Sequence, residues 1–378
     1  FARHKGRRKS LAKPPIETGK RDVRTHKIAI IGGDGIGPEV VMAGLRVLRA
    51  VAAAHGFALD TEDFPWGSDF YRKYGVMMPA DGLEAIRGFD AIYFGAVGDP
   101  DIPDDVTLWG LRLALCQGLD QYANVRPAKL LPGLTGPLRE DLGRQVDWIV
   151  VRENSEGEYA GIGGRTHRGT AHEVGIDTTM FTRTGVERIQ RYAFEIARTR
   201  SRKHLTCVTK SNAQKHGMVM WDDIFDEVSA DYSDIATTRV LVDACAAQMV
   251  LKPGTMDVIV ATNLHADILS DLAGALSGSL GMAASANLDP ERRGPSMFEP
   301  VHGTAPDIVG QGIANPLAAI ASGAMMFDHL GEGDAARRLD AAIARVAREA
   351  SVLPPDLGGT ATTEEVADAV IEALELGN

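Results

Sequence analysis

Short apolar runs alternate with segments of helical spacing along most of this chain, and that alternation constrains its fold more than any other feature. Residues 26–33 form an isoleucine-rich run that ends in glycine, which predicts a buried strand. Helical spacing follows over 37–56, with Pro38 in the first turn and Gly56 at the end. Further strands are expected at 57–64, 90–98, 148–154, 204–211, 238–244 and 256–263, and further helices at 107–119, 183–200, 217–230, 264–277, 315–330, 334–350 and 363–376. The pattern is typical of an α/β fold built on a largely parallel sheet.

One stretch, residues 157–181, interrupts this alternation. It is rich in Gly and Thr, contains β-branched residues and shows no helical spacing. We expect it to form a hairpin arm that projects from the body of the protein. Arms of this kind often complete a symmetric dimer.

Length and composition narrow the class of protein. The chain has 378 residues, of which 44% are apolar and 24% charged, as is ordinary for a globular protein of two domains or one large one. It has no uncharged apolar run of about 18 residues, so no membrane-spanning helix is expected. The three cysteines, Cys116, Cys207 and Cys245, are too few and too scattered for a disulfide framework or a thiolate zinc site. We therefore expect a reducing compartment and a cytoplasmic protein.

Charge is distributed unevenly along the sequence. The net charge is −11, but residues 1–27 contribute +8, so the remainder carries −19. An acidic body argues against nucleic acid as the main partner, and we expect no membrane partner. We interpret residues 1–26 as a basic, disordered tail, with a nucleic-acid arm or a transit peptide as the alternatives. The segment has no apolar core, so we do not expect a secretory signal.

The glycine-rich segment IGGDGIGPEV at 31–40 resembles a dinucleotide-binding fingerprint, but its spacing fails. That fingerprint requires G-x-G-x-x-G, and counting from Gly33 and Gly35 the third position is Pro38. No G-K-[ST] follows, so the segment is not a P-loop either. It predicts a tight turn from strand to helix, whose amides could face an anion, and a fold other than the Rossmann fold.

Carboxylates gather in TNLHADILSDLAG at 262–274. Asp267 and Asp271 are four residues apart on a predicted helix, so they share one face and repel each other. A divalent cation such as Mg²⁺ or Mn²⁺ would offset that repulsion, and a solvated acidic face is the alternative. Asp243 stands at the end of a predicted strand, where it could be a third metal ligand or a helix cap.

Basic groups supply the complementary half of a site. Arg126 and Arg152 lie at the ends of apolar segments, where they could bind a carboxylate or form surface ion pairs. Lys210 stands at the end of a predicted strand and could act as a base. Tyr159, at the start of the arm, could act as an acid or simply pack as an aromatic side chain. Together with the aspartates, these residues suggest a metal-held polycarboxylate.

These motifs resemble the metal-dependent β-decarboxylating 2-hydroxyacid dehydrogenases, the family of isocitrate and isopropylmalate dehydrogenases. The resemblance runs from Lys27 to the end of the chain. It rests on segments that occur in the family's order and at similar spacing: IGGDGIGPEV, FGAVG, DQYANVRPAK, VRENSEGEY, VTKSN, VDACAAQ, NLHADILSDL, FEPVHGTAPDI and GIANPLAAI. Within the family, FDAIYFGAVGDPD, LWG and MFTRTGVERI look most like the members that act on tartrate and D-malate.

The resemblance implies a fold of two domains and a homodimer with shared active sites. Residues 27–121 together with 278–378 would form a large cofactor-side domain. Residues 122–277 would form the second domain, with the dimer arm near 157–181. The implied reaction is NAD-dependent oxidation of a small 2-hydroxy dicarboxylic acid with loss of CO₂, which requires Mg²⁺ or Mn²⁺, with K⁺ as a further candidate ion.

The resemblance also implies a role for each matching residue. Arg126 and Arg152 would hold the substrate, Tyr159 would be the acid, and Lys210 would be the base, reaching in from the other subunit. Asp267 and Asp271 would bind the metal together with Asp243 of the other subunit. The NAD-binding residues would be His302, Gly303, Asp307, Ile308 and Asn315, with Asp307 accepting the ribose hydroxyls.

The sequence departs from the family pattern next to these residues. The family has a third substrate arginine at the position of Cys116, which cannot bind a carboxylate in the same way. Arg112 lies one helical turn earlier and could reach the same carboxylate, or it could point to solvent while Cys116 packs the helix. An arginine beside C3 of the substrate, together with Trp109, favours malate, tartrate or an acidic substituent over an isopropyl group. The alternatives are 3-isopropylmalate dehydrogenase and, because of Cys116, a non-catalytic regulatory subunit of a related enzyme.

Overall fold

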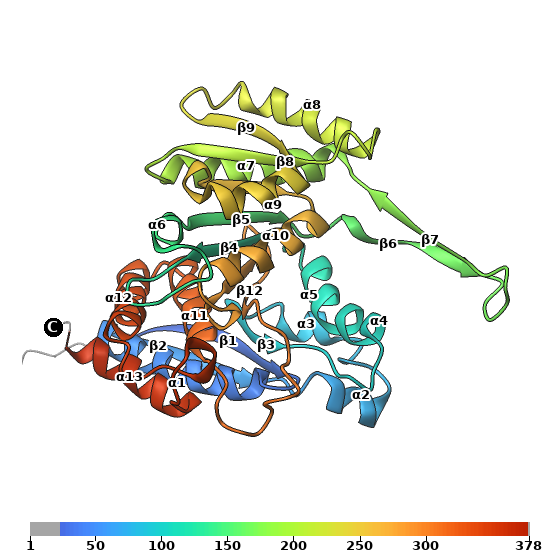
Figure 1. Ribbon diagram of the computed structural model, residues 1–378. Helices are drawn as coiled ribbons and strands as arrows, with labels where there is room; N and C mark the ends of the chain where they lie inside the picture. Colours follow the sequence, from blue (N-terminus) through green and yellow to red (C-terminus); the bar gives the residue numbers. More distant parts are fainter. Residues whose placement is uncertain (1–22, 377–378) are drawn as a thin grey trace, which may run out of the picture.

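The computed structural model describes residues 23–376, and its elements follow the predicted alternation (Figure 1). The first part of the chain contains β1 (Arg24–Gly33), α1 (Gly37–His55), β2 (Phe57–Asp63), α2 (Ser68–Tyr74), α3 (Gly82–Ile86), β3 (Ala91–Ala96), α4 (Asp104–Thr107), η1 (Leu108–Arg112), α5 (Leu113–Gly118), β4 (Ala123–Lys129), α6 (Glu140–Gly143) and β5 (Asp147–Glu153).

The middle and the end of the chain continue this pattern. They contain β6 (Gly157–Thr166), β7 (Val174–Met180), α7 (Arg183–Thr199), β8 (His204–Thr209), α8 (Gly217–Ser229), β9 (Ala236–Leu241), α9 (Val242–Leu251), η2 (Pro253–Thr255), β10 (Val258–Ala261), α10 (Asn263–Leu276), η3 (Leu280–Met282), β11 (Ala284–Leu288), β12 (Ser296–Pro300), α11 (Leu317–His329), α12 (Gly333–Glu349), η4 (Pro355–Leu357) and α13 (Thr363–Glu375).

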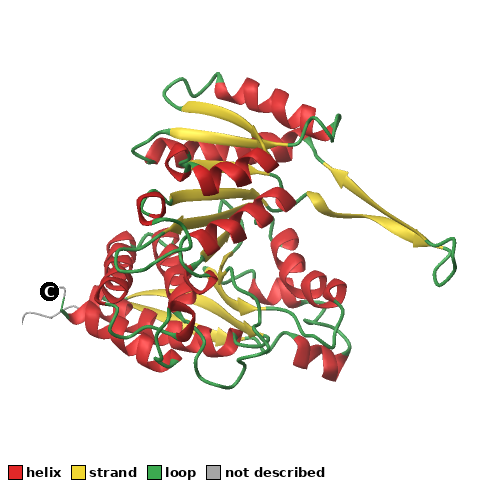
Figure 2. Cartoon of the chain, in the orientation of Figure 1, coloured by secondary structure: helices red, strands yellow, loops and turns green. Residues whose placement is uncertain are grey.

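Ten of these strands form one sheet in the order β2-β1-β3-β12-β11-β4-β5-β10-β8-β9. Neighbouring strands are parallel except at the centre, where β11 runs antiparallel to both β12 and β4, and β4 runs antiparallel to β5. Helices flank the sheet (Figure 2). The α/β fold with a mostly parallel sheet is therefore confirmed. The antiparallel strands at its centre were not predicted.

The apolar core divides into clusters along the sheet. Two clusters draw their buried members from residues 28–119 and 286–374. Two others draw theirs from residues 122–276. This grouping follows the division into 27–121 with 278–378 and 122–277 that the sequence suggested, and the bounds of those domains stay a prediction.

The start of β1 corrects the position at which the fold was expected to begin. The strand begins at Arg24, inside the segment interpreted as a tail, and both Arg24 and His26 contact the carboxylate of Glu332, at 3.1 and 3.0 Å. These contacts tie the strand to the start of α12. The rest of the tail prediction, residues 1–22, lies outside the described residues.

The hairpin arm is confirmed. β6 and β7 pair antiparallel with each other in a separate sheet of two strands and extend away from the body of the protein (Figure 1). The arm carries exposed apolar side chains at Ile162, Val174 and Ile176. Elsewhere, no helix within residues 23–376 is both long enough and apolar enough to cross a membrane.

The helix expected at 107–119 differs from the prediction in its internal geometry. It begins with the short α4, passes through the π-helical turn η1 and continues as α5. A π-helical turn is wider than an α-helical one and is often found at functional sites. Arg112 is the last residue of this turn, so the irregular geometry helps to set the direction of its side chain.

Candidate active site

A cavity of about 220 Å³ lies where β3, β12, β4, β5 and α10 meet. Its walls are polar, since three arginines and three acidic side chains line it. The lining residues are Phe94, Gly95, Ala96, Val97, Leu108, Arg112, Leu113, Arg126, Arg152, Tyr159, Asp267, Asp271, Glu299, Pro300, Val301, His302 and Gly303.

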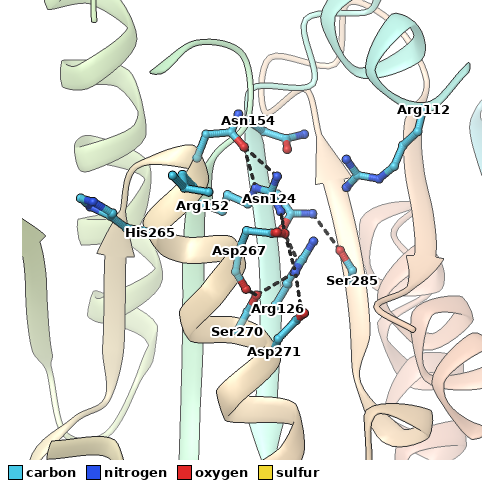
Figure 3. A network of polar contacts seen from close by, with 12 residues as sticks. Arg112, Asn124, Arg126, Arg152, Asn154, His265, Asp267, Ser270, Asp271 and Ser285 are labelled. Atoms are coloured by element: carbon cyan, nitrogen blue, oxygen red, sulfur yellow. Dashed lines mark hydrogen bonds and ion pairs between the residues drawn. The ribbon is translucent and has the colours of Figure 1, made fainter. Parts of the chain in front are cut away.

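Helix α10 presents the two predicted metal ligands to this cavity. It begins at Asn263, and the side chain of the capping residue Thr262 accepts a hydrogen bond from the amide of His265. Asp267 and Asp271 are therefore one turn apart on the same side of the helix, as expected. Figure 3 shows both facing the guanidinium group of Arg126.

Arg126 and Arg152 approach the aspartates from two adjacent antiparallel strands. Arg126 lies in the middle of β4, and Arg152 is the penultimate residue of β5. Arg152 donates to Asp267, and the Nη1 of Arg126 lies 3.4 Å from the same Oδ1 atom of Asp267 and 3.8 Å from Asp271. Neither arginine is the surface ion pair that the sequence left open, since both are buried.

Polar neighbours fix the orientation of both guanidinium groups. Arg126 donates to Asn124 at 2.9 Å and to Ser270 at 2.7 Å. Arg152 donates twice to the Oδ1 atom of Asn263, at 2.9 and 2.7 Å. Because their remaining donors face Asp267 in the cavity, the two groups are aimed before any anion binds.

Burial and neighbouring charges shift the pKa values of Asp267, Asp271 and Arg126 away from their ordinary values. Burial opposes ionisation of Asp267, but Arg152 and Arg126 outweigh it and hold the pKa of this carboxyl below its usual range. For Asp271 burial prevails, so its pKa is raised. Burial, followed by repulsion from Arg152, lowers the pKa of Arg126 to about 10. A bound anion would favour the charged form of Arg126, and a bound cation would favour the ionised form of Asp271.

Arg112 also faces the cavity, which settles the alternative that it points to solvent. Its side chain is 10% exposed and pairs with the carboxylate of Glu299, the nearest contact being 2.7 Å. Cys116 is fully buried one turn later, and burial raises the pKa of its thiol to about 11. Cys116 therefore packs the helix while Arg112 supplies the third guanidinium of the site.

Sequence reasoning did not identify Glu299 or the asparagines that surround it. Asn287 donates to Glu299 at 2.8 Å, and its own Oδ1 atom accepts from Asn124 at 2.9 Å and from Asn154 at 3.0 Å. Glu299 stands within the quoted segment FEPVHGTAPDI, and Asn124 and Asn154 stand beside Arg126 and Arg152. These residues lie in or next to segments that the sequence analysis singled out, but no local sequence pattern predicts that they contact one another.

Tyr159 reaches the cavity from the first strand of the arm. Its ring lies 5.4 Å from the guanidinium carbon of Arg152, and its carbonyl accepts a hydrogen bond of 3.2 Å from Gln117. The ring thus faces the same space as the arginines, and the base of the arm is attached to α5. Tyr159 therefore belongs to the cavity lining, and its role as a proton donor stays a prediction.

Lys210 and Asp243 lie together, but not in this cavity. Lys210 follows β8, Asp243 stands in the first turn of α9, and the lysine donates a hydrogen bond to the aspartate. Neither belongs to the cavity lining. Within residues 23–376, no three His, Cys, Asp or Glu side chains form a group that could hold a metal. One chain therefore supplies two of the three predicted metal ligands.

The loop that follows β12 holds the predicted cofactor residues. His302 and Gly303 line the cavity, while Asp307 and Ile308 lie further along the loop, outside the lining. Asn315 donates to Asp356 at 2.9 Å and accepts from the amide of Leu317 at 3.0 Å. The assignment of these residues to NAD stays a prediction.

The glycine turn after β1 contacts this same loop. Gly33 and Gly35 have φ angles of +69° and +59°, and the amide of Ile36 donates to the carbonyl of Thr304 at 3.0 Å. A Cβ atom on Gly35 would lie 2.2 Å from that carbonyl oxygen. The turn thus contacts the loop backbone to backbone. This close contact and the positive φ angles explain why glycines stand here although the segment is not a Rossmann fingerprint.

Comparison with known proteins agrees with this geometry. The family model described as isocitrate/isopropylmalate dehydrogenase matches residues 27–370. A probable tartrate dehydrogenase/decarboxylase of Agrobacterium vitis is 62% identical over 94% of this chain and 99% of its own, and the D-malate dehydrogenase [decarboxylating] of Escherichia coli K12 is 49% identical over 93% and 99%. The crystal structure of isocitrate dehydrogenase from Methylococcus capsulatus superposes with a TM-score of 0.83 at 39% identity, covering 92% of this chain and 99% of the other. The chain belongs to the isocitrate/isopropylmalate dehydrogenase family.

Proposed function

We propose that this protein oxidises and decarboxylates a small 2-hydroxy dicarboxylic acid, D-malate or tartrate, with NAD⁺ and Mg²⁺ or Mn²⁺. One observation carries the proposal: three buried arginines and two aspartates converge on a single cavity of about 220 Å³. A dicarboxylate held through a metal ion fits that combination of charges. The names of the two relatives, a tartrate dehydrogenase/decarboxylase and a D-malate dehydrogenase, support the substrate class.

The donor set fits a hard divalent cation. Asp267 and Asp271 offer carboxylate oxygens one helical turn apart, which Mg²⁺ and Mn²⁺ favour. Burial raises the pKa of Asp271, and a cation beside it would stabilise its ionised form. Arg126 and Arg152, which contact Asp267 in this structure, would then offer those donors to the substrate carboxylates without changing orientation.

In the proposed reaction, the metal ion and NAD⁺ supply part of the chemistry, and side chains of the protein supply the proton transfers. When bound, the divalent ion would draw electron density from the substrate's hydroxyl and keto oxygens, and NAD⁺ would accept the hydride from C2. Lys210 takes the proton of the C2 hydroxyl as the hydride leaves. The β-keto acid then loses CO₂, and the phenol of Tyr159 protonates C3 of the enol product. Asp307 favours the ribose hydroxyls of NAD over the phosphate of NADP by charge repulsion.

A second copy of the chain completes the site in this proposal. Lys210 and Asp243 are paired with each other outside the cavity of their own chain, which supports a role for both in the site of a neighbouring subunit. The surface carries apolar side chains that a homodimer would cover: Leu251 on α9 is 68% exposed and Ile268 on α10 is 57% exposed. The arm adds Ile162 and Ile176.

The test is NADH formation by the purified chain with Mn²⁺ and K⁺. The panel is D-malate, L- and meso-tartrate, 3-isopropylmalate and isocitrate, each with NAD⁺ or NADP⁺. Turnover of D-malate or tartrate with NAD⁺ and release of CO₂ is the expected result. A preference for 3-isopropylmalate would contradict the substrate assignment, and no turnover of any substrate would favour the regulatory-subunit alternative that Cys116 suggests.

A further inference from the structure

Arg112 is held by a protein carboxylate inside the cavity wall. Its Nε atom donates to both oxygens of Glu299, at 2.9 and 3.2 Å, and its Nη2 atom lies 2.7 Å from Oε1. Arg112 is 8% exposed and Glu299 is 4% exposed, so water screens this pair little. Two of the three guanidinium nitrogens are thus committed to Glu299, and the charge of Arg112 is already balanced.

Glu299 is itself fixed and ionised. Asn287 donates to its Oε1 atom at 2.8 Å and also accepts from the Nη2 atom of Arg112 at 3.2 Å. Burial opposes ionisation of Glu299, but the adjacent Arg112 outweighs it and keeps the pKa of this carboxyl below its usual range. The pair therefore acts as a rigid, neutral unit in the cavity wall.

One guanidinium nitrogen of Arg112, Nη1, remains available to a ligand. This Nη1 atom makes no hydrogen bond within the described part of the chain. The atom is also not completely buried, so a ligand can reach it. The cavity as a whole contains three guanidinium groups and three carboxylates, which balance in charge. A divalent cation at the two aspartates would leave an excess of two positive charges, which matches a dianion.

We propose that the Arg112–Glu299 pair makes the cavity selective for substrates whose third substituent is uncharged, such as the hydrogen of malate or the hydroxyl of tartrate. The Nη1 atom of Arg112 donates a hydrogen bond to a C3 hydroxyl. A third carboxylate in the same place meets a guanidinium whose charge is already paired and the negative charge of Glu299 beside it. The inference rests on the proposed function, which supplies the class of substrate. The presence of Arg112 by itself is compatible with either a hydroxyl or an acidic group on C3, and its pairing with Glu299 favours the hydroxyl.

The decisive variant is Glu299→Gln, which keeps the shape and an acceptor oxygen while it frees the charge of Arg112. The proposal predicts that the ratio of kcat/KM for isocitrate to that for tartrate rises at least tenfold. Glu299→Asp, which keeps the charge, should leave the ratio within threefold of the wild type. A purely structural role for Glu299 would instead lower both activities together and leave the ratio unchanged.

A binding measurement removes the dependence on turnover. Calorimetry with Mn²⁺ and without NAD⁺ compares succinate with propane-1,2,3-tricarboxylate, neither of which has a hydroxyl to oxidise. Relative to the wild type, Glu299→Gln should lower the dissociation constant of the tricarboxylate, divided by that of succinate, at least tenfold. The double variant Arg112→Gln with Glu299→Gln restores the charge balance and should return that ratio to within threefold of the wild type.

The controls separate this inference from the proposed function. Ser285→Ala removes a hydroxyl that accepts a hydrogen bond from Asn124 at 2.8 Å without changing any charge, and it should leave both ratios unchanged. If Glu299→Gln does not fold, Arg112→Gln serves instead and should shift the binding ratio away from the tricarboxylate. An unchanged binding ratio in the folded variant overturns the inference. A wild type that oxidises no hydroxy acid overturns the proposed function, while the binding ratio still tests the pair.

Discussion

At the scale of the residue, Asp267 combines two tasks that Asp271 does not share. It neutralises Arg152, whose side chain is 3% exposed, and it is a proposed metal ligand. Asp271 has a side chain that is 58% exposed and approaches Arg126 only at 3.8 Å. The two aspartates are equivalent in the sequence pattern, yet the structure makes one of them a structural counter-ion.

Replacing each aspartate by asparagine should therefore have different effects on the metal-free protein. We expect Asp267→Asn to lower the free energy of unfolding by about 2 kcal/mol, because it removes the carboxylate that balances the charge of the buried Arg152. Asp271→Asn should lower it by less than about 1 kcal/mol. Urea denaturation in EDTA measures both, and equal losses would contradict the assignment of Asp267 as the counter-ion.

We expect Mn²⁺ to raise the melting temperature of the wild type, and both substitutions should abolish that rise because each removes a proposed ligand. Asp69→Asn, on exposed α2, is a matched control that should retain the full shift. A Mn²⁺ shift that survives Asp271→Asn would place the metal elsewhere.

His329 gives the protein a pH-dependent stability outside the site. Burial, together with the nearby Arg292, lowers the pKa of this imidazole to about 4, against an ordinary value near 6.5. Between these values the unfolded chain binds the proton and the folded chain does not, so stability falls as pH falls from about 6.5 to 4. Asp328 and Asp289 act in the opposite direction and are outweighed.

The variant His329→Phe, which keeps a ring against Phe298, should remove this contribution. We expect the urea midpoint of the wild type to drop more steeply than that of the variant between pH 6.5 and pH 4.5. Parallel curves for the two proteins would show that His329 titrates normally.

At the scale of the element, the junction between the glycine turn and the loop after β12 leaves no room for a single added carbon atom. A Cβ atom on Gly35 would lie 2.2 Å from the carbonyl oxygen of Thr304 and 2.5 Å from its Cβ atom. Because the obstacle is mainly backbone, the loop that carries the proposed cofactor residues has to move.

We expect Gly35→Ala to weaken NADH binding at least tenfold. Gly310→Ala is the matched control: its φ of +76° carries similar backbone strain, but no atom lies within 4 Å of the added carbon. Fluorescence titration with NADH measures both. Equal weakening in the two variants would mean that strain, rather than the displaced loop, is responsible.

Most elements were predictable because their signal is local. The run at 204–211 and the pattern at 183–200 appear as β8 and α7 with ends shifted by no more than two residues. The arm was predictable because it lacks helical spacing. The antiparallel β11 and β12 and the π-helical turn ending at Arg112 were not, because pairing across the sheet and a widened turn depend on contacts made far along the chain.

At the scale of the whole molecule, the sheet order explains why only part of the site was predictable. Arg126, Arg152, Asp267 and Tyr159 stand in recognisable segments, and the fold brings them together in one cavity. The pairing of Arg112 with Glu299 spans 187 residues, and no short-range pattern records it. A single chain also does not contain the complete proposed site, since Lys210 and Asp243 lie outside the cavity in which they are proposed to act.

The central claim is that two copies of the chain share an active site for dehydrogenation, and mixing two inactive variants tests it most directly. Lys210→Met and Asp271→Asn should each be inactive as homodimers. In a mixed dimer, one site contains both an intact Asp271 and an intact Lys210 from the partner, so random mixing should restore about a quarter of wild-type NADH formation from D-malate or tartrate. Differently tagged subunits confirm that mixed dimers have formed. Recovery near that level supports the shared site, whereas mixed dimers that remain inactive would contradict it.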